Sequence, residues 1–205
     1  MRKKKKKGYK LMIGILIFTG MLSMVSCGNK VEGVSGSVLT IEKDGTVHAK
    51  IVEDFTEGYY NKEELQQVIL EQAASYNRNT GSGSVTVEKV ETNEDMVTVQ
   101  MTYAGVQDYA SFNHAIFFAG TAKEALDAGF DLNVVLSGVK DAMDTVGESD
   151  ILGMEDCVLL ITNINDGIAV NGKALYVSDN VVAAPNAKTI WYSGDENGLA
   201  YVIYQ

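Results

Sequence analysis

This 205-residue chain begins with a strongly basic head and a short apolar run, and no other stretch of the sequence is as informative. Residues 1–10 contain seven basic residues and no acidic residue, and a mostly apolar, uncharged stretch follows from Leu11 to Val25. A basic head, a short apolar body and a small residue at the cleavage point are the parts of a secretory signal. Because a membrane-spanning helix needs about 20 apolar residues, a permanent span is the weaker interpretation. The sequence therefore predicts export of the rest of the chain.

The end of the apolar run, from Met24 to Cys27, resembles the lipobox of bacterial lipoproteins, in which a Cys follows a small residue. The resemblance implies that Cys27 receives a diacylglyceryl thioether and that a dedicated peptidase then removes residues 1–26. An N-acyl group on the new N-terminus of Cys27 is a further modification that the resemblance leaves open. Met24 and Val25 depart from the commonest lipobox residues, but both are tolerated variants. The alternative is an ordinary signal peptide with an incidental Cys. The family of the remaining chain is not recognised from its residues.

The lipid would place the protein on the outer face of the cell membrane, because two acyl chains are enough for stable anchoring. The lysine-rich head and the single proline fit a Gram-positive source. Residues 27–37 are interpreted as the lipidated Cys and a Gly-rich flexible tether, with a reach of about 18 Å for ten such residues. Residues 38–205 are expected to form a single extracytoplasmic domain.

The charge of the mature chain restricts its partners. Cleavage would remove 7 of the 17 basic residues and none of the 27 acidic ones, which leaves a net charge of −17. Such a chain is repelled by nucleic acid and by anionic lipid, so we expect no nucleic acid partner and membrane contact through the acyl chains alone. Cys157 would be the one remaining thiol, which excludes an internal disulfide. The predicted partner is an unidentified surface ligand or protein.

Local patterns in the first half predict two hairpins around a helix. Residues 38–55 form the first hairpin, with Asp44-Gly45 as its turn. Apolar residues at helical spacing predict a helix over 61–76, in which Asn61 is the N-cap. Residues 85–103 alternate between apolar and polar side chains and form the second hairpin.

The second half is less regular and mostly β-like. Over residues 105–156 we expect a strand at 115–119, a helix at 121–128 capped by Thr121, a strand at 132–136 and a helix at 137–144. Five further strands are expected at 157–162, 167–170, 174–177, 189–192 and 199–204. The expected fold class is α+β, with a mainly antiparallel sheet, one long amphipathic helix and one or two short helices.

Two groups of residues are candidates for binding. Acidic and aromatic side chains gather before the helix, at Glu53, Asp54, Glu57, Tyr59 and Tyr60, where paired carboxylates beside aromatic rings could bind or hydrolyse a sugar. Acids at this place also suit a solvated helix N-terminus. Adjacent Trp191 and Tyr192 could form an aromatic platform, although tyrosines in strands are more often core residues.

No catalytic or metal-binding pattern stands out, and we predict no cofactor beyond the acyl groups on Cys27. The two histidines, His48 and His114, are interpreted as structural, and Cys157 as a buried apolar thiol. Three functions remain open. The first is a non-catalytic module at the cell surface that binds a ligand or a partner. The second is a cell-wall hydrolase that uses acidic residues, and the third is a small solute-binding lipoprotein.

Overall fold

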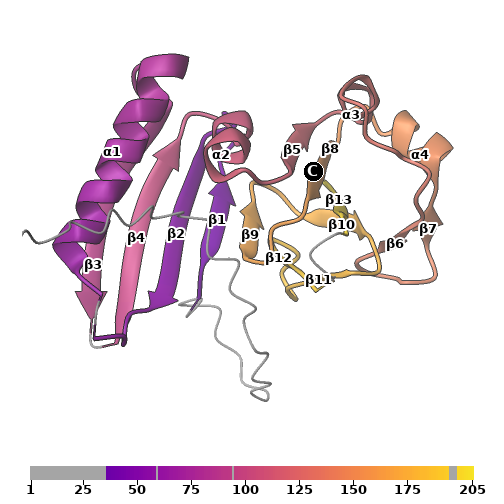
Figure 1. The fold of residues 1–205 in the computed structure, drawn as a ribbon. Coiled ribbons are helices and arrows are strands. Elements are labelled where there is room, and N and C mark those ends of the chain that lie inside the picture. The colour runs from indigo at the N-terminus through magenta and orange to yellow at the C-terminus, as the bar shows by residue number, and fades with distance from the viewer. Residues whose placement is uncertain (1–35, 59, 94, 194–197) are drawn as a thin grey trace, which may run out of the picture. The chain divides into compact units, whose positions relative to one another are not determined.

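Two β-sheets form the framework of the fold in a computed structural model that describes residues 36–58, 60–93, 95–193 and 198–205. The described residues form thirteen strands and four helices, all within a single compact unit (Figure 1). The expected α+β class is therefore wrong, and the fold is β-rich with two sheets. Cys27 and the first eight residues of the tether lie outside the described residues.

The larger sheet has the strand order β11-β12-β9-β1-β2-β4-β3. Its strands are β1 (Val38–Ile41), β2 (Val47–Asp54), β3 (Val85–Asn93), β4 (Met96–Tyr103), β9 (Gly167–Val170), β11 (Val181–Ala183) and β12 (Thr189–Tyr192). The central strand β1 pairs antiparallel with β2 and parallel with β9. The chain therefore enters this sheet from the tether at its middle strand.

Both predicted hairpins of the first half are confirmed. Strands β1 and β2 join through a turn in which Gly45 has a φ of 87° and the Asp44 carboxylate accepts a hydrogen bond from the Thr46 amide. This positive φ explains the glycine, because it carries no Cβ penalty there. Strands β3 and β4 pair along their length, with a register shift between Val87 and Lys89.

The smaller sheet has the strand order β5-β8-β13-β10-β6-β7, and its pairs are antiparallel. Its strands are β5 (Phe117–Gly120), β6 (Leu136–Gly138), β7 (Thr145–Val146), β8 (Val158–Thr162), β10 (Ala174–Val177) and β13 (Ala200–Tyr204). All five residues of β13 are buried. The five strands predicted after residue 156 are confirmed, whereas β11 was not predicted.

Four helices accompany the sheets: α1 (Lys62–Thr80), α2 (Val106–Asn113), α3 (Ala122–Asp127) and α4 (Glu148–Gly153). The predicted caps are confirmed, because the Asn61 side chain accepts from the Glu64 amide and Thr121 forms a capping box with Glu124. Helix α1 runs along β3 (Figure 1), but Ala73 is its one fully buried residue. It is thus a mostly exposed helix with a narrow contact seam, not the long amphipathic helix that was expected.

No helix in the described part of the chain combines the length and the apolar character that crossing a bilayer requires.

Predictions for residues 105–156 are partly wrong. The strand at 115–119 and the helix at 121–128 correspond to β5 and α3, but residues 132–135 are not a strand and residues 137–144 are not helical. Helices α2 and α4 were missed. Their N-cap residues are Gly105 and Gly147, which have no side chain to accept from the first turn, although the Asp150 carboxylate accepts from the Gly147 amide in α4. The local signal that identified α3 is therefore absent at these two helices.

Two hydrophobic cores hold the sheets together. The first, which we call the central core, joins one face of the larger sheet to residues of the smaller one, including Leu160 and Val202. The second core packs the opposite face of the smaller sheet against α3 and α4, through Leu159 and Ile161 among others. Successive residues of a strand point to opposite faces, so β8 and β13 contribute to both cores.

Candidate binding face

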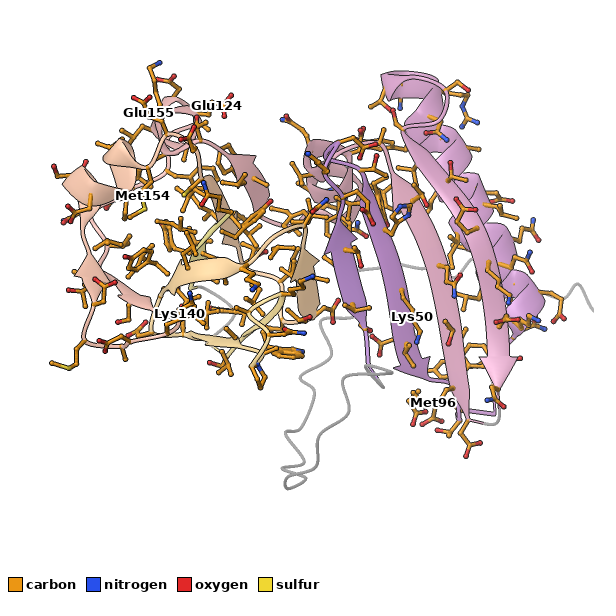
Figure 2. All side chains as sticks on the ribbon, turned by 180° about the vertical axis from the view of Figure 1, so that it is seen from behind. Lys50, Met96, Glu124, Lys140, Met154 and Glu155 are labelled. Atoms are coloured by element: carbon orange, nitrogen blue, oxygen red, sulfur yellow. The ribbon has the colours of Figure 1, made fainter. Side chains whose placement is uncertain are left out.

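The two faces of the larger sheet differ in what covers them. The face that we call the inner face lies on the central core, which also takes the apolar side chains of α1 and α2, such as Ile69 and Tyr109. We call the opposite face the outer face. It carries the residues of each strand that alternate with those pointing to the inner face. Figure 2 labels Lys50, which lies on β2 and belongs to this outer face.

Side chains of the outer face form two rows that run across the strands. The pairing register aligns one residue of each strand in the first row, in the order Val182, Trp191, Gly167, Val38, Lys50, Gln100 and Lys89. The second row contains Thr189, Ala169, Thr40, His48, Thr102 and Thr86. One end of the outer face is thus apolar and aromatic, and the other end is polar.

Trp191 marks the apolar end of the first row. Its indole lies directly over Gly167, where an added Cβ would be 2.9 Å from the indole Nε1. The next residue outward, Val182, is 57% exposed. Trp191 is half-buried, so part of its indole remains accessible to solvent. The arrangement forms an aromatic platform from Trp191 alone.

The polar end of the outer face is slightly hollowed. An open hollow of about 150 Å³ is lined by side chains from β1, β2, β3 and β4, including Thr40, Lys50, Glu88 and Gln100. The His48 Nδ1 and the Thr102 hydroxyl lie 3.0 Å apart across its floor. Ligand pockets for small molecules usually measure about 300–1,000 Å³ and enclose their ligand. The hollow therefore suits a ligand that lies on the surface.

The predicted acidic pair does not converge. Glu53 and Asp54 are consecutive residues of β2, so their side chains point to opposite faces of the sheet. The Asp54 carboxylate instead accepts hydrogen bonds from the Thr56 amide and hydroxyl, which lower its pKa. Two carboxylates placed on opposite faces cannot act on one glycosidic bond.

Glu53 has a different acidic neighbour, Asp166, which the sequence analysis did not single out. Partial burial raises the pKa of Glu53, and the negative charge of Asp166 raises it further. Burial also raises the pKa of Asp166. The pKa of Tyr109 is raised mainly by its own burial, and then by Tyr103 and by the charge of Asp166. The two acids are 113 positions apart and meet only because β9 and β2 flank the same strand, so no sequence spacing could reveal them.

Like the acidic pair, the aromatic candidates do not come together in one place. Tyr60 stacks on Phe55 with a distance of 4.9 Å between ring centroids, and its amide donates to the Glu57 carbonyl. Tyr192 lies on the inner face and is buried, whereas Trp191 lies on the outer face. Adjacent strand residues cannot form one platform. Tyr59 lies outside the described residues.

Most of the other tyrosines belong to the core. Tyr103 contacts Tyr109 and Phe112 edge to face, and Tyr109 contacts Phe117 in the same way. Burial raises the pKa of Tyr103 to about 12. This chain of rings links β4 to α2 and to β5, so it joins the two sheets.

Other chemistry-bearing groups are not assembled into a site. Within the described ranges, no group of three or more His, Cys, Asp or Glu side chains is placed to hold a metal ion. Burial, followed by the charge of Asp156, raises the pKa of the Cys157 thiol, so this cysteine is not activated as a nucleophile. A hollow of about 390 Å³ along α1 is lined by exposed residues of that helix, among them Leu70.

The outer face thus gathers an aromatic platform, a polar hollow and two registered rows of side chains on one surface. Neither the fold alone nor its β-rich class indicates an activity, because unrelated functions share the same folds. Compared with protein-family models, with curated proteins and with solved structures, the chain matches none.

Proposed function

We propose that the protein is a non-catalytic binding module, held at the outer face of the cell membrane by acyl chains on Cys27, whose ligand surface is the outer face of the larger sheet. The observation that carries the binding role is that outer face. It combines the half-buried Trp191 with a polar hollow, and the helices α1 and α2 pack on the opposite face. The lipobox-like run ending at Cys27 supports the anchor.

Attachment to the membrane is compatible with the position of the tether. The tether leads into β1, which is hydrogen-bonded to a strand on each side. Ser37, the last tether residue, exchanges hydrogen bonds with the backbone of Val52 on β2. A pull on the anchor would therefore load a strand that is paired on both sides in the middle of a seven-stranded sheet.

Replacement of the two cysteines one at a time tests the anchor. We expect Cys27→Ser to abolish incorporation of a labelled fatty acid and to move the protein out of the membrane fraction. Cys157→Ser is the matched control, since it also removes one thiol, and it should keep both the label and the membrane location. Unchanged labelling of the Cys27→Ser protein would refute the lipid anchor.

A hydrolase is the second candidate, and the pair of Glu53 and Asp166 is the one observation that favours it. Raised pKa values suit a general acid, although structural acids show them too. The hollow of the outer face is lined by neither residue. Incubation of the protein with glycan oligomers separates the two functions. Shorter products that the wild type forms and the Asp166→Asn variant does not form would establish hydrolysis.

A further inference from the structure

We infer that the ligand of the outer face is a linear, uncharged polysaccharide that lies across the strands. The inference rests on the proposed function, because it names the ligand class of the same surface. Four features of the outer face lead to it, namely the repeat of the rows, the aromatic platform, the polar groups of the hollow and the balance of charge.

The first feature is the repeat of the rows. Neighbouring strands of a sheet lie about 4.8 Å apart, so the six steps of the first row extend over about 29 Å. One pyranose ring in an extended chain is about as long as one such step. Side chains from successive strands therefore meet successive rings of a polymer laid across the sheet. A compact solute would use only one part of this length.

The second feature is the platform. The indole Nε1 of Trp191 lies close to Gly167, and this contact limits how far the ring can move when a ligand covers it. Aromatic rings contribute a large apolar contact area at interfaces. The C–H faces of a sugar ring are apolar, whereas its edges carry hydroxyl groups. The platform consequently suits a pyranose ring that stacks on the indole.

The third feature is the set of polar groups in the hollow. Gln100, Lys50 and the hydroxyls of Thr40 and Thr102 offer both donors and acceptors on a surface that remains open. Sugar hydroxyl groups need both kinds of partner along their edges. An apolar peptide or an acyl chain would leave these groups without partners, which is costly when they lose water.

The fourth feature is charge. On the outer face, Lys89 forms an ion pair with Glu91 at 2.7 Å, and Lys50 and Glu88 both line the hollow. With Asp54 at the end of β2 counted as well, two positive charges stand against three negative ones, so the charges nearly balance. Elsewhere the domain is strongly acidic, with nine acidic and two basic residues between positions 121 and 157. A polyanion would be repelled by the domain as a whole, and a basic protein would be drawn to its acidic part. An uncharged polymer fits the nearly balanced face.

The test uses the full-length lipidated protein, purified in a detergent without a sugar headgroup. The probes are cellohexaose, chitohexaose, xylohexaose and maltohexaose, with hexagalacturonate as the charged counterpart. The chain contains a single Trp, so its emission reports directly on the platform. We expect at least one neutral hexasaccharide to shift this emission and to release heat in calorimetry, and hexagalacturonate to do neither.

Two variants locate the bound sugar. Trp191→Ala should weaken binding about tenfold or more, which corresponds to about 1.4 kcal/mol. The double variant Lys50→Ala, Gln100→Ala should weaken it as well, and it keeps the Trp reporter and leaves Gly167 covered. Met143→Ala is the control, because Met143 is 89% exposed and precedes β7 of the other sheet.

Three results would overturn the inference: no neutral hexasaccharide binds, both outer-face variants bind as the wild type does, or polylysine binds in a Trp191-dependent way in place of a glycan. The first and third results leave the outer face standing as a surface for another ligand, whereas the second also removes the outer face from the proposed function. The lipid anchor is tested separately, by labelling at Cys27. Loss of the anchor alone would not affect sugar binding by the purified protein, so the two failures can be told apart.

Discussion

The position of Trp191 depends on the absence of a side chain at residue 167. A Cβ there would lie 2.9 Å from the indole Nε1, so the ring has to move. We expect Gly167→Ala to shift the emission of Trp191 and to lower the free energy of unfolding by about 1 kcal/mol, as overpacking does. Denaturant unfolding followed by fluorescence measures both.

Ala169→Gly is the control for this prediction, because residue 169 lies two positions along β9 on the same outer face. Its emission should match that of the wild type. If Gly167→Ala left the emission unchanged, the indole could not be seated on Gly167 as described.

The raised pKa values of Glu53 and Asp166 lead us to expect that the stability of the protein depends on pH. Their pKa values are raised in the folded protein, so between the ordinary carboxyl pKa near 4 and the raised values the folded state binds more protons than the unfolded state. The free energy of unfolding therefore falls as pH rises through this window. The largest part of the fall comes from Asp166, since solvent screens the charge of the exposed Glu53.

Asp166→Asn removes one of the two charges. We expect it to be more stable than the wild type at neutral pH and to show a flatter profile of melting temperature against pH. Asp179→Asn serves as the comparison, because Asp179 is an exposed acid and should change neither quantity. A destabilised Asp166→Asn protein at neutral pH would show that the carboxylate is favourably paired.

At the scale of single elements, the features that formed as predicted are those specified by neighbouring residues. Asp44-Gly45 closes the first hairpin, and Asn61 and Thr121 cap their helices. These signals act over three or four residues, so they can be read from the sequence. Helices α2 and α4 begin at glycines without such a cap and were missed for that reason.

The capping box of α3 yields an element-scale prediction. The Thr121 hydroxyl accepts from the Glu124 amide, and the Glu124 carboxylate accepts from the Thr121 amide. We expect Thr121→Ala to lower the free energy of unfolding by about 1 kcal/mol. Ser149→Ala, in the exposed first turn of α4, should have a smaller effect. Equal stability losses in the two variants, measured by chemical denaturation, would contradict the role of the cap.

At the scale of the whole molecule, β8 couples the two cores, because its successive side chains point alternately into one core and the other. Ile161 is fully buried in the second core, whereas its neighbour Leu160 belongs to the central core. We expect Ile161→Ala to destabilise the protein by about 2–5 kcal/mol. Because both cores share β8 and β13, the loss should appear in one cooperative transition.

Two probes check this coupling. Trp191 lies on the larger sheet, and far-ultraviolet circular dichroism reports on both sheets. In Ile161→Ala the two signals should move together to lower denaturant concentration. A fluorescence transition that stays in place while the dichroism transition becomes biphasic would show that the sheets unfold separately.

Signals between neighbouring residues specified part of the local structure, and the first 27 residues predict where the protein is located. Alternation, turn residues and caps specify hairpins and helix ends, and the run ending at Cys27 predicts export and lipidation. The pairing of distant strands was decided only by the tertiary structure. It divided the strands into two sheets, placed Asp166 beside Glu53 and aligned Trp191 with Lys50 and Gln100 on one face. The physical reason is that strand pairing depends on the burial of whole faces, which no short stretch of sequence encodes.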